Sequence, residues 1–486
     1  MLFYMKRVLL VGLFLVIALV GLNLRYIDYD LVPPFAETND EFFYPWAGMT
    51  WIRTGNPVAW SWFPAYPTRS VVVKWGINFP MVSPWLEKPP LYTLIMGTWM
   101  VINQVPDLFD VRLSLVRQIP VVLSLFTVLF TGILATYVFS KKVGIVAAIL
   151  YATTPTLVLA NRLSLTENLL TPLVLLTFIF FLQQPKKRYE HWLQPICVGI
   201  CASLVVMTKN IGVMAGVAVF GWYLLQKKYW SALLVGLLVS IGIAVHPLIG
   251  WLYDWDLYRR VMADYQHDFA NSGLPQLIAT IFLYPVVGPK NHPILDGSML
   301  LGYLLFFTSP LWLLQKTITP EFVSIREKIK SFFYRTSFVT PIQWKEKVLL
   351  SFPFGYITLL ALLASGDKFS FYGWHVYPLF PFLIILVAKV LLDVWQSPQL
   401  LPLLTLTLIL GSSAVRFVFA TLPREVLYRW QYVLIAVFVL VLGTLVLPRR
   451  VKRWALLGLF ACFIGVNIYA SIHLRSFFPM MEQPWR

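Results

Sequence analysis

Two pairs of charged residues flank a long aromatic stretch near the amino terminus, and both carry side chains that could do chemistry. Asp40-Glu41 opens this stretch and Glu87-Lys88 closes it. The rest of the chain is strongly apolar, with 58% hydrophobic residues and a mean hydropathy of +0.72. A charge in hydrocarbon costs at least about 3 kcal/mol, so a carboxylate in such a chain must be solvated, paired or catalytic. Residues 25–90 are therefore where catalytic groups are expected.

The elements that must position these groups are apolar helices. The chain has 486 residues, of which only 13% are charged. Apolar runs of about 17–25 residues, the length of a membrane span, recur along most of it. This pattern predicts an all-α polytopic membrane protein rather than several soluble domains. The three cysteines lie inside apolar runs and are interpreted as small buried side chains: Cys197, Cys201 and Cys462.

The net charge of +17 is concentrated in short basic clusters at the ends of the apolar segments. These clusters are Lys6-Arg7, Lys141-Lys142, Lys186-Lys187-Arg188, Lys227-Lys228 and residues 449–453. Positive charge beside the spans is what the positive-inside rule produces. The expected partners of these residues are therefore the anionic headgroups of membrane lipids, and not nucleic acid.

The same clusters constrain the number of membrane crossings. Hydropathy gives fourteen apolar segments, and if all of them crossed, four basic clusters would lie outside. If one segment between residues 91 and 138 does not cross, every cluster moves inside. Segment 91–104 is the natural candidate because it is short for a span, and segment 117–138 is the alternative. We therefore expect thirteen crossings, with the large loops 25–90 and 251–297 on the outer side.

Four sequence elements occur in an order that resembles a known enzyme family. The first is the loop that opens with Asp40-Glu41, continues through residues 44–55 and closes with Glu87-Lys88-Pro89-Pro90-Leu91-Tyr92. The others are an Arg-x-x-x-x-Glu-x-Leu-Leu element at 162–170, a Thr-Lys element at 202–210 and a Tyr-x-x-Pro-x-x-Pro type element at 372–381. Together they resemble the GT-C glycosyltransferases. The most similar branch contains the lipid A aminoarabinose transferases and the protein O-mannosyltransferase-like enzymes.

The resemblance implies a fold and a reaction. It implies the GT-C fold, with about 13 transmembrane helices and large outer loops that carry short interfacial helices. Residues 1–395 would form the catalytic module, and residues 396–486 would add C-terminal helices and a short outer tail. The reaction would move a hexosyl or pentosyl group, with inversion, from a polyprenyl-phosphate donor to an envelope lipid, glycan or protein. The site would face outward from the plasma (inner) membrane.

Inversion by direct displacement needs a carboxylate that accepts the proton of the acceptor. Asp40 is the expected base because it matches the acidic residue that opens the loop in the family. Glu41 is the close competitor, and either residue could instead pair with an arginine.

The departing phosphate needs a cationic environment. The groups expected to bind the donor phosphate or lipid are Lys88, Arg162, Lys209, Lys368, Tyr372 and His375. Two alternatives stay open. Arg162 and Glu167 could form a structural ion pair, with Glu167 as an acid of the site. Tyr372 and His375 could simply anchor the chain at the membrane interface.

A divalent metal ion is a possible cofactor, since in the aminoarabinose branch the equivalent of Glu87 helps to hold a metal near the donor phosphate. Zinc, magnesium or manganese would need more ligands, and His267 and His292 are the candidates. Each histidine taken alone is better explained as a surface or hydrogen-bonded imidazole. The tryptophans of the first loop suit sugar stacking, but interfacial anchoring is favoured for most of them: Trp46, Trp51, Trp60, Trp62, Trp75 and Trp85.

Two rival functions fit a many-helix membrane protein. A lipid-linked sugar flippase or ligase would share the basic patches but has no need of the Asp-Glu opening and the Glu-Lys-Pro-Pro closing of one loop. A secondary transporter would place its charges at the bilayer midplane within broken helices. Most acidic residues of this chain lie in predicted loops, which favours the transferase.

Overall fold

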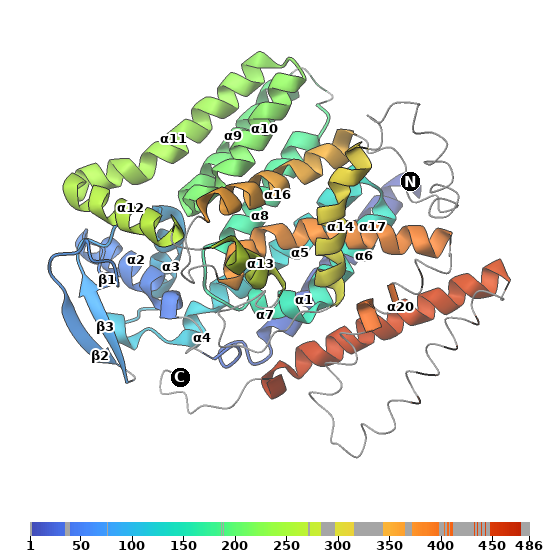
Figure 1. Cartoon of the computed structure of the whole chain (residues 1–486), viewed down its shortest axis with the longest axis horizontal. Helices are drawn as coiled ribbons and strands as arrows, with labels where there is room; N and C mark the ends of the chain where they lie inside the picture. Colours follow the sequence, from blue (N-terminus) through green and yellow to red (C-terminus); the bar gives the residue numbers. More distant parts are fainter. Residues whose placement is uncertain are drawn as a thin grey trace.

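The computed structural model describes the residues that build the predicted site and most of the helices around it (Figure 1). The described residues are 2–34, 39–74, 76–185, 187, 189–270, 273–282, 297–314, 344–364, 372–397 and 448–477, with single positions between 403 and 443. Lys368 and His292 lie outside them.

Long apolar helices form the body of the molecule. They are α1 (Leu2–Tyr26), α5 (Gln118–Val138), α6 (Lys141–Thr153), α8 (Glu167–Leu182), α9 (Glu190–Thr208), α10 (Val213–Leu225), α11 (Tyr229–Tyr253), α14 (Gly297–Leu314), α16 (Trp344–Leu363), α17 (Phe380–Gln396) and α20 (Arg449–Ile472). Helices α8 and α17 run through the centre, where most of their side chains are buried. Helix α11 leaves Leu233, Leu237 and Ile241 more than half exposed along one face. Such an apolar outer face is expected of a helix that contacts hydrocarbon.

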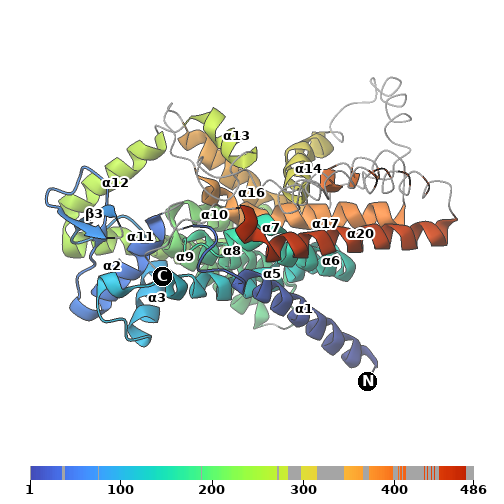
Figure 2. The same cartoon turned by 90° about the horizontal axis from the view of Figure 1, so that it is seen from below.

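Seven of the described helices are long and apolar enough to cross a membrane. Shorter apolar helices include α3 (Pro90–Ile102), which matches the segment that was expected not to cross. The polytopic helical fold class is confirmed. The total of thirteen crossings stays a prediction, since segments 399–420 and 430–447 lie mostly outside the described residues. Helix α20 flanks the bundle (Figure 2), and the Ser471 hydroxyl donates to the carbonyl oxygen of Thr153 on α6 at 3.1 Å.

The first outer loop folds into a small layer of its own. The 3-10 helix η2 (Asn39–Phe42) leads into α2 (Phe43–Thr54), and a three-stranded antiparallel sheet follows in the order β1-β3-β2. Strands β2 (Ser70–Lys74) and β3 (Ile77–Val82) pair with Ser70 opposite Met81, while β1 (Ala59–Trp60) pairs on the other side of β3. Gly76 adopts the positive φ of 73° that the turn between β2 and β3 requires. The sequence analysis did not predict this sheet.

Three tryptophans of this loop hold the layer together, which corrects the expectation that they anchor at the membrane surface. Trp46, Trp60 and Trp85 are all at most 6% exposed. Phe43 lies between two of them, with ring centroids 5.4 Å from Trp60 and 5.2 Å from Trp85. Trp62, in contrast, is 59% exposed and remains available at the surface.

Close packing of two helices fixes this layer on the bundle. The backbones of α2 and α3 meet at Gly48 and Gly97, where a Cβ on Gly97 would lie 2.1 Å from the carbonyl carbon of Gly48. The amphipathic helix α12 (Trp255–Ala270) then covers the loop, and its Asp264 accepts a hydrogen bond from the Ala65 amide at 2.7 Å. The expected short helices in the outer loops are therefore present as α2 and α12, together with α13 (Leu274–Phe282).

Candidate functional site

The two adjacent carboxylates of helix η2, Asp40 and Glu41, lie in different environments. Glu41 is fully buried and pairs with Arg117, with Oε1 2.5 Å from Nη2 and Oε2 2.9 Å from Nε. The amide of Ser164 also donates to Glu41 at 2.8 Å. Arg117 in turn donates to the carbonyl oxygens of Tyr29 and Pro33. Glu41 is thus a structural anchor with no access to substrate, which corrects its assignment as the competing base.

Asp40 keeps part of its surface exposed and lies within a cluster of charges. Desolvation raises the pKa of Asp40 to about 6, and the neighbouring charges of Lys88 and Lys209 oppose this while Glu167 and Glu41 add to it. A carboxylate with a pKa near the working pH can accept a proton and release it again. Asp40 therefore has a raised pKa together with the accessibility that the fully buried Glu41 lacks.

Lys88, just before the start of α3, lies over an aromatic ring. Its Nζ lies 4.0 Å from the ring centroid of Tyr265 on α12, a cation–π contact. Desolvation alone would lower the pKa of Lys88, but the interactions with Tyr265 and with the carboxylates of Glu87 and Asp40 outweigh it and the net shift is upward. The lysine therefore stays cationic. Pro89 precedes the helix and Pro90 occupies its first turn, which restricts the backbone on which Lys88 stands.

The peptide groups just before this pair are clamped from two sides. The amide of Leu86 donates to the hydroxyl of Tyr66 at 3.0 Å. The carbonyl oxygen of Leu86 lies 3.1 Å from Nε2 of His246, which is buried on α11. The outer loop and the helix bundle thus jointly fix the position from which Glu87 and Lys88 project.

A second lysine reaches the site from a break between two helices. Helix α9 ends at Thr208, and Lys209 adopts an extended backbone before the 3-10 helix η4 (Asn210–Gly212) begins. This break turns the side chain inward, where Lys209 forms an ion pair with Glu167 at the start of α8. Both residues are at most 7% exposed. The expected pair of Glu167 with Arg162 is therefore corrected, because Glu167 bonds Lys209 instead.

Arg162 lies behind the site. It is fully buried and donates to the carbonyl oxygens of Leu24 at 3.0 Å and Val32 at 3.4 Å. Arg25 braces the same loop through Asn161, at 3.1 Å. These contacts fix the chain between α7 (Pro155–Ala160) and α8, and they correct the assignment of Arg162 to the donor phosphate.

The fourth sequence element, residues 372–381, forms a buried wall beside Lys88 and Lys209. The 3-10 helix η6 (Gly373–Leu379) begins after Tyr372, whose amide lies 3.2 Å from Nδ1 of His375. Tyr356 on α16 donates to the carbonyl oxygen of His375 at 2.9 Å. Tyr372 stacks on Trp374 with centroids 4.4 Å apart. His375 is 7% exposed, so it belongs to the packed wall and is not an anchor at the membrane surface.

The fold of this chain is similar to that of a solved membrane protein. The archaeal oligosaccharyltransferase AglB from Archaeoglobus fulgidus, solved with an inhibitory peptide and a dolichol-phosphate, matches with a TM-score of 0.52 at 12% identity. The match covers 99% of this chain and 57% of AglB, so this chain spans little more than half of that protein. The chain has the GT-C fold. The predicted resemblance is thereby confirmed at the level of the fold.

Other comparisons also found similar proteins. Residues 87–252 match the family described as dolichyl-phosphate-mannose-protein mannosyltransferase. ArnT from Cupriavidus metallidurans matches in its apo state with a TM-score of 0.48 at 14% identity, over 98% of this chain and 78% of ArnT. The undecaprenyl phosphate complex of ArnT matches with a TM-score of 0.47 at 13% identity, over 97% and 77%. No curated protein sequence matches the chain.

The expected divalent metal ion stays a prediction. Glu87 is buried beside the cationic Lys88, and the described residues contain no group of three histidines, cysteines or carboxylates that could hold an ion. The other two expected ligands give no further test here, since the side chain of His267 and the whole of His292 lie outside the described residues. No step of the reaction is therefore derived through a metal.

Sequence reasoning missed several residues of this site. Arg117 and His246 lie at positions where a charged or polar group enters an apolar segment, and that signal could have flagged both. Tyr44 and Tyr265 gave no such signal, since the outer loops are rich in aromatic residues. Burial and the carboxylates Glu167 and Asp40 raise the pKa of Tyr44 above its ordinary value, so its phenol is a neutral donor in the site.

Proposed function

We propose that this protein is an integral-membrane inverting glycosyltransferase that moves a sugar from a polyprenyl-phosphate donor to an envelope acceptor. The acceptor would be a lipid, a glycan or a protein on the outer side of the plasma (inner) membrane, and the sugar a hexose or a pentose. One observation carries the proposal. Asp40 is a partly exposed carboxylate with a raised pKa, beside two lysines, in a protein with the GT-C fold.

In the proposed reaction Asp40 accepts the proton of the acceptor hydroxyl as its oxygen attacks the anomeric carbon. The new bond forms on the face opposite the donor phosphate, and the bond between the anomeric carbon and the phosphate oxygen breaks with its electron pair on that oxygen. Configuration at the anomeric carbon is thereby inverted. Loss of a positioned general base typically lowers the rate about 10²–10⁴-fold.

Lys88 and Lys209 are the proposed partners of the departing phosphate. Both act electrostatically on Asp40 and therefore belong to the same cluster. Lys209 is already paired with Glu167, so Lys88, held by the Tyr265 ring, is the more available cation. We further propose Lys368, outside the described residues, as an additional cation, and Tyr372 and His375 as part of the wall along the lipid donor.

The proposal is tested with purified protein in nanodiscs, a panel of radiolabelled polyprenyl-phosphate hexoses and pentoses, and an envelope extract as the source of acceptor. The expected result is release of polyprenyl phosphate together with labelled, non-donor product. Asp40→Asn should lower turnover by about 10²-fold or more while the protein stays folded. Asp110→Asn, which changes an exposed aspartate in the segment after α3, is the matched control and should retain full turnover.

Lys88→Ala separates donor binding from the proton transfer. The variant should bind the donor more weakly by about 1.5–3 kcal/mol, the range for a hydrogen bond to a charged group. Full turnover in Asp40→Asn would remove Asp40 from the mechanism. Uptake of intact donor into proteoliposomes without cleavage would replace the transferase by a transporter.

A further inference from the structure

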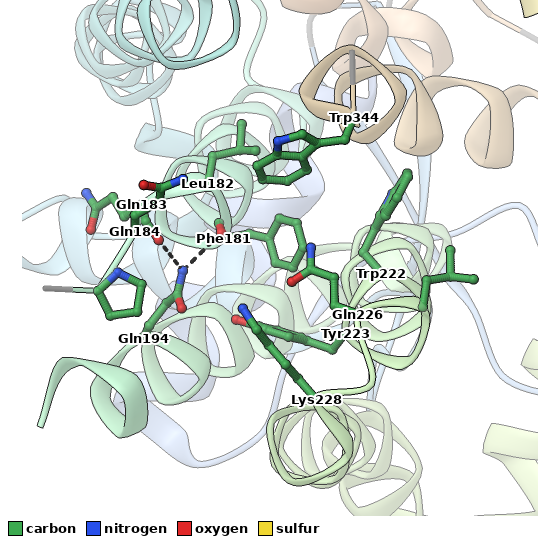
Figure 3. A pocket seen from close by; sticks show the side chains of 12 residues that line it. Phe181, Leu182, Gln183, Gln184, Gln194, Trp222, Tyr223, Gln226, Lys228 and Trp344 are labelled. Atoms are coloured by element: carbon green, nitrogen blue, oxygen red, sulfur yellow. Dashed lines mark hydrogen bonds between the residues drawn. The ribbon is translucent and has the colours of Figure 1, made fainter. Parts of the chain in front are cut away.

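A cavity lies at the end of the bundle opposite to the candidate site. Its volume is about 360 Å³, within the range of small-molecule sites. It is enclosed by the ends of α8, α9, α10 and α16 and by the turn into α11 (Figure 3). Helix α9 separates the two places, with the cavity beside its first turns and Lys209 after its last residue. At about 1.5 Å per residue, this helix of 19 residues is long enough to put them on opposite faces of a membrane.

The cavity contains a buried hydroxyl group that no described residue satisfies. Tyr223 is 1% exposed, and its hydroxyl has no hydrogen-bond partner among the described residues. The ring is held edge-on by Phe181 at 4.9 Å, so it cannot turn away. Figure 3 shows Tyr223 and Lys228 extending into the same cavity. A buried hydroxyl without a hydrogen-bond partner is unfavourable. A ligand that accepts a hydrogen bond from it would remove this penalty.

A tight turn presents a lysine at the rim of the cavity. Helix α10 ends in a Schellman motif, in which the amide of Lys228 donates to Tyr223 and the amide of Lys227 donates to Leu224, both at 2.9 Å. Lys227 takes the positive φ of 58° that this motif requires. The motif fixes the backbone of Lys228 beside Tyr223. The residues that line the cavity include this lysine and no carboxylate, so the site favours an anion.

The remaining walls favour a lipid over a free anion. Trp222, Trp344 and Leu225 line the cavity, and Leu225 is 74% exposed toward the outside of the bundle. Trp230, in the first turn of α11, is 75% exposed and is typical of a residue at the level of lipid headgroups. The amide of Gln194 is already used on carbonyl oxygens at the end of α8, at 2.9 Å from Phe180 and 3.0 Å from Phe181. A ligand here would thus meet a cation and a hydroxyl at its head and apolar surface beside it.

We propose that this cavity binds the phosphate headgroup of an anionic phospholipid from the leaflet opposite to the candidate site. The Lys228 ammonium would face the phosphate and the Tyr223 hydroxyl would donate to one of its oxygens. The acyl chains would leave past Leu225 and Trp230. The positive-inside rule assigns this leaflet to the inner face, since Lys187 and Lys227 lie at the same end. The inference does not depend on the proposed reaction.

The test is native mass spectrometry of the delipidated protein titrated with phosphatidylglycerol, phosphatidylcholine and diacylglycerol. Phosphatidylglycerol should bind at least about fivefold more tightly than phosphatidylcholine, and diacylglycerol should not compete. A lysine near anionic lipid contributes about 1 kcal/mol, so Lys228→Gln should weaken phosphatidylglycerol binding about fivefold. Tyr223→Phe, which removes only the hydroxyl, should weaken it by a similar factor. Lys187→Gln changes an exposed lysine that does not line the cavity, and should change the affinity less than twofold.

Three outcomes would overturn the inference. Equal binding of the three lipids would show that the headgroup is not recognised. Unchanged affinity in both Lys228→Gln and Tyr223→Phe would place the lipid elsewhere. Displacement of phosphatidylglycerol by millimolar glycerol phosphate or inorganic phosphate would identify a free anion as the ligand. An unchanged unfolding temperature in Tyr223→Phe would show that a loss of binding does not come from a loss of the fold.

Discussion

Two neighbouring carboxylates with different environments define the candidate site at the scale of single residues. Glu41 has an arginine and a backbone amide as partners and is fully buried, whereas Asp40 is partly exposed and lies among opposing charges. Environment, and not residue type, therefore separates the structural acid from the candidate base. The sequence alone left this choice open, because it gave no means of assigning Arg117 to Glu41 across 76 positions of the chain.

The raised pKa of Asp40 predicts how the activity depends on pH. Asp40 must be ionised to accept a proton, and its pKa is about 6, so kcat/KM should rise from pH 5 to pH 7 and level off above. At pH 5 about a tenth of the molecules would carry the ionised base, which predicts a rate about tenfold below the plateau. Initial rates between pH 4.5 and 8.5 in the nanodisc assay measure this rise, which is the acidic limb of the pH–rate profile.

A variant of Lys88 tests the direction in which its charge shifts the pKa of Asp40. The Lys88 charge lowers the pKa of Asp40, so Lys88→Gln should move the acidic limb to higher pH. Lys74→Gln, on strand β2, is the control and should leave the limb in place. A limb that stays at the same pH in Lys88→Gln would show that the titrating group is not Asp40.

The pairing of Glu41 predicts a structural effect when it is changed. Glu41→Gln leaves the buried Arg117 without a counter-charge, and removing one partner of a buried ion pair costs about 3–5 kcal/mol. The unfolding temperature in detergent should fall clearly, with Asp110→Asn as an unaffected reference. Folded Glu41→Gln protein should retain its turnover per molecule. Loss of turnover at an unchanged unfolding temperature would return Glu41 to the role of base.

At the scale of elements, the site depends on how closely the outer layer approaches the bundle. Helices α2 and α3 touch through backbone at Gly48 and Gly97, and α3 carries Lys88 at its mouth. A side chain at either glycine would push the two helices apart. The position of the closing motif relative to Asp40 therefore depends on two glycines that carry no chemistry.

This contact predicts a loss of both stability and activity in Gly48→Ala. A Cβ at this position would lie 1.9 Å from the carbonyl oxygen of Thr93, so one helix must shift. Overpacking typically costs about 1–3 kcal/mol, and a contact against backbone belongs at the upper end. Gly221→Ala on α10 is the control, because a Cβ there meets nothing within 4 Å. Thermal unfolding and donor turnover are measured on both. Equal unfolding temperatures would show that α2 and α3 are not locked together.

The elements that the sequence predicted are those with a strong local signal. Apolar length predicted the helices, and the position of Lys209 in an apolar region predicted a partner or a cavity, which Glu167 provides. The sheet was missed because β3 contains Pro80, and proline argues against an inner strand. Pro80 is tolerated because β1 ends at Trp60, and the next contact on that side is the Ser61 amide donating to the carbonyl oxygen of Pro80 at 2.9 Å, which needs no N–H from the proline. The buried tryptophans could not be predicted, since burial depends on α2, β3 and α12 meeting in space.

At the scale of the whole molecule, the two ends of the bundle differ in charge and chemistry. Asp40, Glu167 and Lys209 lie at one end, and the cavity beside Lys228 lies at the other. Helix α8 links them, with Glu167 as its first residue and Leu182 as its last, and α9 runs from the cavity back to Lys209. The proposed transfer on one face and the proposed lipid site at the opposite end both require a fixed orientation in the membrane, and the positive-inside rule predicts one from the basic clusters.

This orientation predicts which residues are reached from each side of the membrane. Thirteen crossings with the amino terminus inside put the carboxyl terminus outside. In a chain with its three cysteines replaced by alanine, Val73→Cys on the exposed strand β2 should react with an impermeant maleimide in right-side-out vesicles. Lys187→Cys should react only in inside-out vesicles, because α9 lies between it and the site. An alkaline phosphatase fused after Arg486 should be active. A fusion that is active only as a cytoplasmic reporter would leave an even number of crossings, and labelling of both cysteines from one side would mean that α9 does not cross.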